Sequence, residues 1–181
     1  ALKKIITSMA KFIYLAVQIN NPKYPGSPYV VFMDIQQDNL PGYDGKRDTR
    51  DLITWYKDSI IRKPNIRKFW AQALVNEKYE VPNDMVVSRI IFPKFSNICS
   101  CVNYFSLVVV ALFISLIGVL RGKWWYGLII AESINLHYVK NMKREFLAEE
   151  YYFNNSSWYY KPLWANEAER RGKSISLYSY S

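Results

Sequence analysis

The sequence has few of the residues from which metal centres, disulfide frameworks and phosphate-binding loops are built. Its 181 residues include two cysteines, one histidine and seven glycines. Cys99 and Cys101 cannot form a disulfide framework, and together with His137 they fall one ligand short of a structural zinc site. We therefore expect no metal site and take the two thiols to be small buried side chains, with lipidation as the alternative.

Motifs that carry catalysis are also missing. The seven glycines leave little material for a loop that cradles nucleotide phosphates, and no Gly-rich dinucleotide fingerprint or nucleophile elbow occurs. Asp38 belongs to a group of aspartates whose spacing does not fit a calcium loop, and we assign it a turn or capping role. The sequence therefore favours a protein that is not an enzyme and holds no cofactor.

Acidic residues are absent from the first part of the chain, where Asp34 is the first. Residues 1–19 place apolar side chains at helical spacing, with Lys3 and Lys11 on the other side. A basic amphipathic helix without acids is typical of a mitochondrial targeting segment or of a helix on an anionic membrane. A surface helix packed on a partner protein is the alternative.

Charge is absent from Ile98 to Leu120. A helix of this length reaches about 34 Å, and the hydrocarbon core of a bilayer is about 30 Å thick. We predict a transmembrane helix over residues 98–120. The remaining chain offers no large region that could bury it as a core helix. Three small residues share one face of this helix and are expected to pack against a neighbouring helix: Ala111, Ser115 and Gly118.

Basic and aromatic residues follow the predicted span without interruption. Cations at the end of a span meet lipid phosphates, and tryptophans lie at headgroup depth. We predict a site for an anionic phospholipid such as cardiolipin, with general anchoring to the membrane as the alternative. Its residues are Arg121, Lys123, Trp124, Trp125 and Tyr126.

A second crossing by the next apolar stretch is not expected. Residues 124–139 would reach about 24 Å and would place the carboxylate of Glu132 inside lipid, which is costly. We therefore expect residues 121–153 to form a helix that leaves the membrane and packs on a partner protein. The roles of Glu132 and His137 stay open at this stage.

The remaining segments are predicted to form no core of their own. Residues 20–47 are rich in proline and glycine and indicate an extended arm, with one strand-like run over residues 29–35. Residues 48–97 indicate short helices. The segment 154–181, rich in aromatic residues, indicates an extended tail that lies on another protein.

Two helices are expected inside the segment 48–97. Asp48 or Asp51 caps the first, and Asn65 starts a second that runs to about Tyr79. The predicted fold class is a mainly α membrane protein: one transmembrane helix, short amphipathic helices and extended arms, without an independent globular core.

In this architecture the chain resembles the single-span accessory subunits of mitochondrial inner-membrane respiratory complexes. The resemblance rests on the basic amphipathic start, the uncharged span and the aromatic, proline-rich arms. It implies a single-pass, non-catalytic assembly subunit of an electron-transport complex, NADH:ubiquinone oxidoreductase or cytochrome c oxidase. Other subunits and an anionic phospholipid would be its partners.

Two alternatives to this function remain open. The first is an accessory subunit of mitochondrial ATP synthase. The second is a membrane-anchored module that binds RNA or an anionic partner, because the formal net charge is +9. The basic residues are spread along the chain, so no nucleic acid is expected as a partner.

Overall fold

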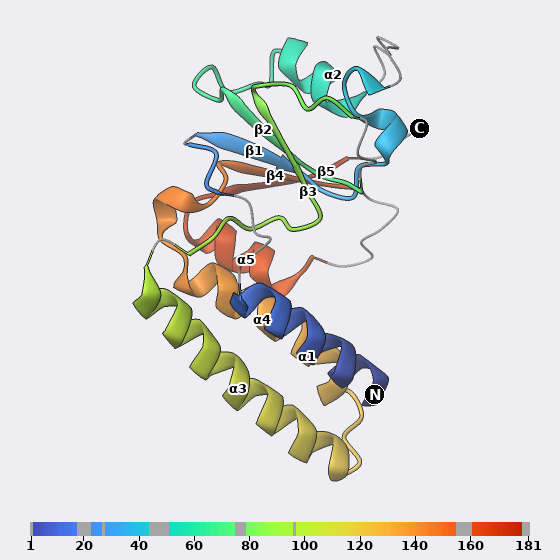
Figure 1. Ribbon diagram of the computed structural model, residues 1–181, viewed down its shortest axis with the longest axis vertical. Helices are drawn as coiled ribbons and strands as arrows, with labels where there is room; N and C mark the ends of the chain where they lie inside the picture. The colour runs from blue at the N-terminus through green and yellow to red at the C-terminus, as the bar shows by residue number, and fades with distance from the viewer. Residues whose placement is uncertain are drawn as a thin grey trace. The chain divides into compact units, whose positions relative to one another are not determined.

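The computed structural model describes residues 2–17, 23–26, 28–43, 51–74, 79–95, 97–154 and 161–178. The chain divides into two compact units, which we call the helical unit and the sheet unit (Figure 1). The helical unit comprises Ala1–Asn21, Lys94–Leu147 and Tyr160–Gly172. The sheet unit comprises Pro22–Pro93, Ala148–Tyr159 and Lys173–Ser181.

The sheet unit is built on five parallel strands in the order β3-β2-β1-β4-β5. Val31 in the central strand lies opposite Trp70 on one side and Tyr151 on the other. Parallel strands buried on both faces read as continuous apolar runs, and the four residues of β1 are fully buried. The strands are β1 (Tyr29–Phe32), β2 (Lys68–Gln72), β3 (Met85–Ser88), β4 (Glu150–Asn154) and β5 (Ser174–Tyr178).

One face of the sheet is covered by helix α2 (Leu52–Asp58), which follows the short 3-10 helix η1 (Gln37–Asn39). Asp51 caps α2 and accepts a hydrogen bond from the backbone N–H of Thr54 at 2.7 Å. Ile53 and Tyr56 are fully buried against the core side of the sheet. The helix therefore closes a hydrophobic core of its own within the sheet unit.

The opposite face of the sheet carries large aromatic residues. The rings of Tyr29 and Trp70 stack with centroids 5.9 Å apart, and both residues are fully buried. The indole N–H of Trp70 donates to the carbonyl of Ile90 at 3.0 Å. This bond fixes the segment after β3 on that face.

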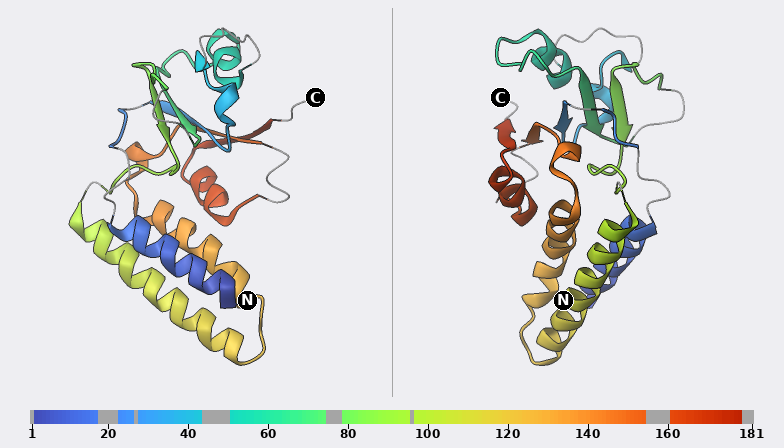
Figure 2. Two further views of the ribbon diagram at one scale, coloured as in Figure 1. Left: turned by 45° about the vertical axis from the view of Figure 1, so that its right-hand side comes forward. Right: turned by 90° about the vertical axis from the view of Figure 1, so that its left-hand side faces the viewer.

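The helical unit contains four α-helices among the described residues. Helices α3 and α4 form an antiparallel hairpin, and α1 lies along it in both views of Figure 2. Gly122, with φ of +80°, makes the turn between α3 and α4. The aromatic ring of Phe12 in α1 contacts Tyr104 in α3. The elements are α1 (Leu2–Val17), α3 (Ile98–Leu120), α4 (Tyr126–Asn141), the 3-10 helix η3 (Arg144–Phe146) and α5 (Leu163–Arg170).

The fold class predicted from the sequence is wrong. The structure is an α/β fold with a five-stranded parallel sheet, not a mainly α chain without a globular core. The helix predicted from Asn65 to Tyr79 contains strand β2, because Phe69 and Ala71 pack into the core at strand spacing. The segment 48–97 also contains β3, and the expected tail contains α5 and β5.

Three local predictions are confirmed. The strand-like run contains β1, Asp51 caps the helix that follows it, and α3 has the bounds Ile98–Leu120 that the absence of charge predicts. The length and composition of α3 would allow it to cross a membrane. Whether it does so stays a prediction.

Candidate functional site at the carboxyl edge of the sheet

A pocket of about 710 Å³ opens where the carboxyl ends of β1, β2 and β3 meet. The segment after β1 supplies one wall, and the residues that end β2 and follow β3 supply the others. The lining residues are Asp34, Ile35, Gln36, Gln37, Asp38, Gln72, Ala73, Leu74 and Arg89.

The topology explains why a pocket forms here. The chain moves from β1 outward to β2 and β3, then returns to the other side of β1 with β4 and β5. In open parallel sheets, ligands bind outside the carboxyl ends of the strands, next to the point where the strand order reverses. The pocket begins at β1, which is one of the two strands at that point.

The segment that leaves β1 is held on both sides. The backbone N–H of Met33 donates to the carbonyl of Tyr152 at 2.9 Å, and that of Ile35 donates to the carbonyl of Gln72 at 3.0 Å. Between them, Asp34 has a left-handed backbone with φ of +55°. Such a conformation costs about 1–2 kcal/mol in most residues and is best tolerated by glycine, Asn and Asp. The turn into η1 is therefore rigidly placed.

Two buried amide atoms in the pocket lining have no hydrogen-bond partner within the described part of the chain. They are Nε2 of Gln37, a donor, and Oε1 of Gln72, an acceptor. The Nε2 atom of Gln72 donates to the carbonyl of Arg89 at 3.2 Å, which orients the amide. A buried polar atom without a partner costs about 1–3 kcal/mol. A ligand with hydroxyl groups would satisfy both atoms.

The remaining lining groups also suit hydroxyl groups better than phosphates. The carboxylates of Asp34 and Asp38 accept hydrogen bonds, and Arg89 donates them. Sites for nucleotide phosphates use glycine-rich backbone and several cations, whereas the described lining contains no glycine and one cation. The pocket therefore fits a polar, polyhydroxylated ligand with little negative charge.

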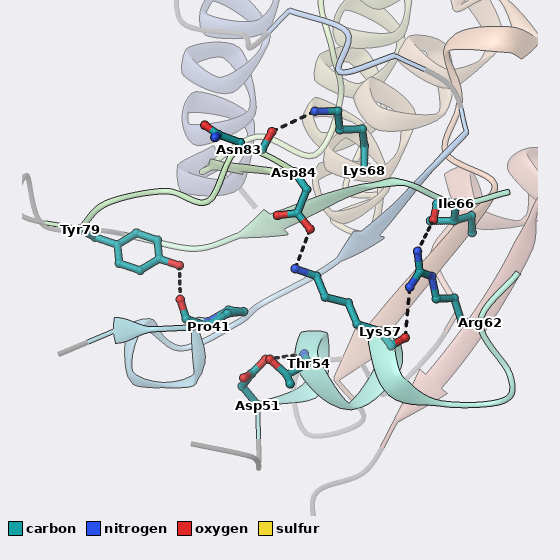
Figure 3. A network of polar contacts seen from close by, with 10 residues as sticks. All are labelled: Pro41, Asp51, Thr54, Lys57, Arg62, Ile66, Lys68, Tyr79, Asn83 and Asp84. Atoms are coloured by element: carbon teal, nitrogen blue, oxygen red, sulfur yellow. Dashed lines mark hydrogen bonds and ion pairs between the residues drawn. The ribbon is translucent and has the colours of Figure 1, made fainter. Parts of the chain in front are cut away.

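Figure 3 shows polar contacts elsewhere in the sheet unit, and none of the residues drawn there lines the pocket. The hydroxyl of Tyr79 donates to the carbonyl of Pro41 at 2.8 Å and so joins the segment after η1 to the segment before β3. Burial, followed by the charges of Asp51 and Asp84, raises the pKa of Tyr79 to about 12. Its hydroxyl therefore remains a hydrogen-bond donor at neutral pH.

A second polar cluster lies at the amino ends of the strands and does not reach the pocket. Glu150, the first residue of β4, accepts a hydrogen bond from the hydroxyl of Tyr56 at 2.7 Å and pairs with Lys63 at 2.9 Å. Burial and the hydrogen bond to Glu150 raise the pKa of Tyr56. We assign this cluster to stability. No group of three or more metal-ligating side chains occurs among the described residues.

The lipid-binding residues predicted from the sequence gather in the turn between α3 and α4. Arg121, Lys123, Trp124 and Trp125 are exposed, and Tyr126 is half-buried. They lie together because they are consecutive in the chain. Lipid binding by this turn stays a prediction.

The predicted packing residues of α3 face a helix of the same chain. Ser115 and Gly118 are buried, and Ala111 is half-buried. A Cβ atom added at Gly118 would lie 2.5 Å from Cγ of Tyr126, so glycine allows the hairpin to close. Packing of this face against another protein stays a prediction.

Glu132 has a structural partner that the sequence did not reveal. Its carboxylate Oε2 accepts a hydrogen bond from the backbone N–H of Leu163, the first residue of α5, at 3.0 Å. A carboxylate at a helix start satisfies an otherwise unpaired N–H and interacts favourably with the helix dipole. His137 is half-buried in α4.

Sequence reasoning missed the pocket. Asp34 follows an apolar run, which is a signal for a strand end with a functional side chain. That signal is readable only once the strand is known to belong to a parallel sheet. Gln72 ends β2 and Arg89 follows β3, and the sequence did not reveal either segment as a strand.

Comparison with known protein families gives one match. Residues 107–181, less than half of the chain, match the family described as polysaccharide biosynthesis PFTS motif protein. This segment begins within α3 and includes α4, β4, α5 and β5, whereas the residues that line the pocket precede it. Comparisons with curated proteins and with solved structures find no significant match.

Proposed function

We propose that the protein takes part in polysaccharide biosynthesis and binds a carbohydrate in the pocket at the carboxyl edge of its sheet. The observation that carries this proposal is the lining of that pocket. It combines two carboxylates, unpaired amide atoms and one guanidinium at the edge where parallel sheets hold ligands. The family match supplies the process and supports a sugar over other polar ligands.

The lining assigns each group a role toward a sugar ring. The carboxylates of Asp34 and Asp38 accept hydrogen bonds from hydroxyl groups. Gln72 Oε1 accepts one more, and Gln37 Nε2 donates to a hydroxyl oxygen. Leu74 offers apolar surface to the C–H face of the ring. This is a binding role, in keeping with the expectation from the sequence of a protein that is not an enzyme.

The mitochondrial accessory subunit predicted from the sequence receives less support. That prediction rested on a chain without a core of its own, and the sheet unit has one. Nothing in the family match points to a respiratory complex or to ATP synthase. We therefore favour the carbohydrate proposal.

Saturation-transfer NMR tests the proposal that the pocket binds a carbohydrate. The full chain in detergent is mixed with neutral monosaccharides and oligosaccharides. Asp34→Asn and Asp38→Asn should each weaken sugar binding about tenfold, because a hydrogen bond to a charged group is worth about 1.5–3 kcal/mol. Asn also tolerates the left-handed backbone at position 34, so this variant should fold.

The matched control is Asp58→Asn, an exposed carboxylate at the end of α2 that is outside the pocket. It should leave binding unchanged. Sugar binding that survives both pocket variants would remove the proposal for this pocket. A preference for nucleoside diphosphates without sugar would remove the ligand class.

A further inference from the structure

We infer that the helical unit binds a phospholipid bilayer with α3 lying in the membrane surface and not crossing it. The inference starts from a row of exposed apolar side chains along α3, which is part of a wider exposed apolar surface that also includes Ile98, Leu107, Val110 and Ile114. Spaced by three or four residues, the members of this row share one side of the helix from its first turn to its last. They are Val102, Phe105, Val109, Phe113, Leu116 and Leu120.

A narrower side of α3 packs against the chain itself. Tyr104 and Val108 are fully buried, and the Tyr104 ring lies 5.9 Å from Phe12 of α1 and 5.1 Å from Tyr138 of α4. The row therefore lies on the outer face of the unit. Within the described residues of α4, large apolar side chains are exposed only at Leu128 and Ile129 in its first turns.

Helix α5 determines how deep the unit can enter lipid. It is attached to α4 at both ends: Glu132 accepts from Leu163, and the guanidinium of Arg171 donates to the carbonyl of Met142 at 2.6 Å. Glu169 and Arg170 on α5 are exposed. Helix α5 thus lies beside the part of α4 that pairs with the first half of α3.

A crossing orientation would therefore carry charges into the hydrocarbon. If α3 stood upright in the bilayer, the antiparallel α4 beside it would bring α5 to membrane depth. Each ionised side chain there is costly, because it loses its hydration in the hydrocarbon. With α3 in the membrane plane, its exposed row meets lipid while Glu132, Glu169 and Arg170 stay in water.

The residues at the end of α3 favour a bilayer over a protein as the occupant. Arg121 and Lys123 are exposed beside Trp124 and Trp125, which are 59% and 45% exposed. Basic residues and tryptophans at the end of an apolar helix lie at the headgroup level of anionic membranes. The inference is independent of sugar binding.

Accessibility of single cysteines distinguishes the two orientations. Cys99→Ser and Cys101→Ser provide the background, with Lys94→Cys before α3 or Lys123→Cys after it. The detergent-solubilised full chain is added to sealed phosphatidylcholine–phosphatidylglycerol vesicles, followed by an impermeant maleimide. An in-plane helix leaves both sites labelled as fully as the control Asp58→Cys in the sheet unit. Labelling at only one end of α3 would overturn the inference in favour of a crossing.

Depth and charge provide the second readout. Spin labels at Val102→Cys, Val109→Cys and Phe113→Cys should report similar, shallow depths, whereas a crossing helix would place them at clearly different depths. Replacing Arg121 and Lys123 by Gln should weaken binding to the anionic vesicles about fivefold per residue. The exposed Lys143→Gln is the control. Vesicles that show no binding, together with self-association of the chain, would assign the row to a protein interface instead.

Discussion

At the scale of one residue, Asp34 shows that the sheet unit holds a strained backbone conformation in the wall of its pocket. Among the described residues it is the only non-glycine with a positive φ, and it lies in the pocket wall. Strained backbone of this kind persists where the surroundings fix it, and it concentrates at functional sites. The hydrogen bonds made by Met33 and Ile35 on either side provide that fixation.

Glu150 is a buried charged residue whose replacement should weaken the sheet unit. Glu150 is 6% exposed and accepts a hydrogen bond from the hydroxyl of Tyr56. It also forms an ion pair with Lys63, whose side chain is 42% exposed. Glu150→Gln removes the charge that Lys63 faces, and screening by water limits the cost. We expect the free energy of unfolding to fall by about 1–2 kcal/mol. Urea unfolding of the full chain, followed by circular dichroism, measures it.

A suitable control for that variant is Glu145→Gln, whose side chain is 67% exposed. It should change the free energy of unfolding by less than about 0.5 kcal/mol. If both variants unfold at the same urea concentration, the buried cluster around Glu150 contributes nothing specific.

At the scale of elements, the hairpin of α3 and α4 depends on the missing side chain of Gly118. A Cβ atom there would lie within 2.6 Å of two ring atoms of Tyr126, which is closer than packed atoms approach. Gly118→Ala should therefore destabilise the hairpin by about 1–3 kcal/mol through overpacking, reduced by the roughly 1 kcal/mol of helix propensity that alanine adds. Thermal unfolding of the full chain in detergent measures the change.

A double-mutant cycle separates the two effects in that prediction. In a Tyr126→Ala background the clash is gone, so Gly118→Ala should become neutral or stabilising. Ser106→Ala, at an exposed position of α3, controls for helix propensity, although it also removes the hydrogen bond that the hydroxyl donates to the carbonyl of Val102. A Gly118→Ala variant equally destabilised in both backgrounds would show that Tyr126 does not require the glycine.

The sequence predicted elements well where the local signal did not depend on packing. The start of α2 at Asp51 follows from a capping side chain, and the bounds of α3 follow from missing charge. Strand β2 was missed because Phe69 and Trp70 also fit helical spacing, and its two buried faces erase the alternation that marks a strand. Pairing with the neighbouring strands β1 and β3 makes this segment a strand.

At the scale of the whole molecule, alkaline pH should lower the stability of the sheet unit. Burial and the charge of Glu150 raise the pKa of Tyr152 to about 12, above its ordinary value of about 10. Below pH 10 the hydroxyl is protonated in both folded and unfolded chains. Above it the unfolded chain releases the proton first, so stability should fall as pH rises from about 10 to 12.

Urea unfolding at pH 8 and at pH 11 checks this prediction. The midpoint should drop at pH 11, and Tyr152→Phe should lose less between the two pH values because it has no proton to release. An identical loss in the variant and in the unmodified chain would contradict the assigned role of Tyr152.

The pocket belongs to the whole-molecule scale as well, because no single segment contains it. Asp34, Gln72 and Arg89 come from three strand ends that lie far apart in the sequence. Asp38 was expected from the sequence to lie in a turn, and no sequence pattern singled out Gln72. Their meeting depends on strand order, which requires pairing between distant segments.

The sequence by itself determined the properties that depend on neighbouring residues: the uncharged length of α3, the basic aromatic turn after it, the cap at Asp51 and the apolar run of β1. Each follows from hydropathy or hydrogen bonding within a few positions. Tertiary structure alone decided the parallel sheet, the pocket at its carboxyl edge and the bond from Glu132 to α5. These rest on contacts between residues distant in the chain, whose free energy appears only when the strands and helices have packed.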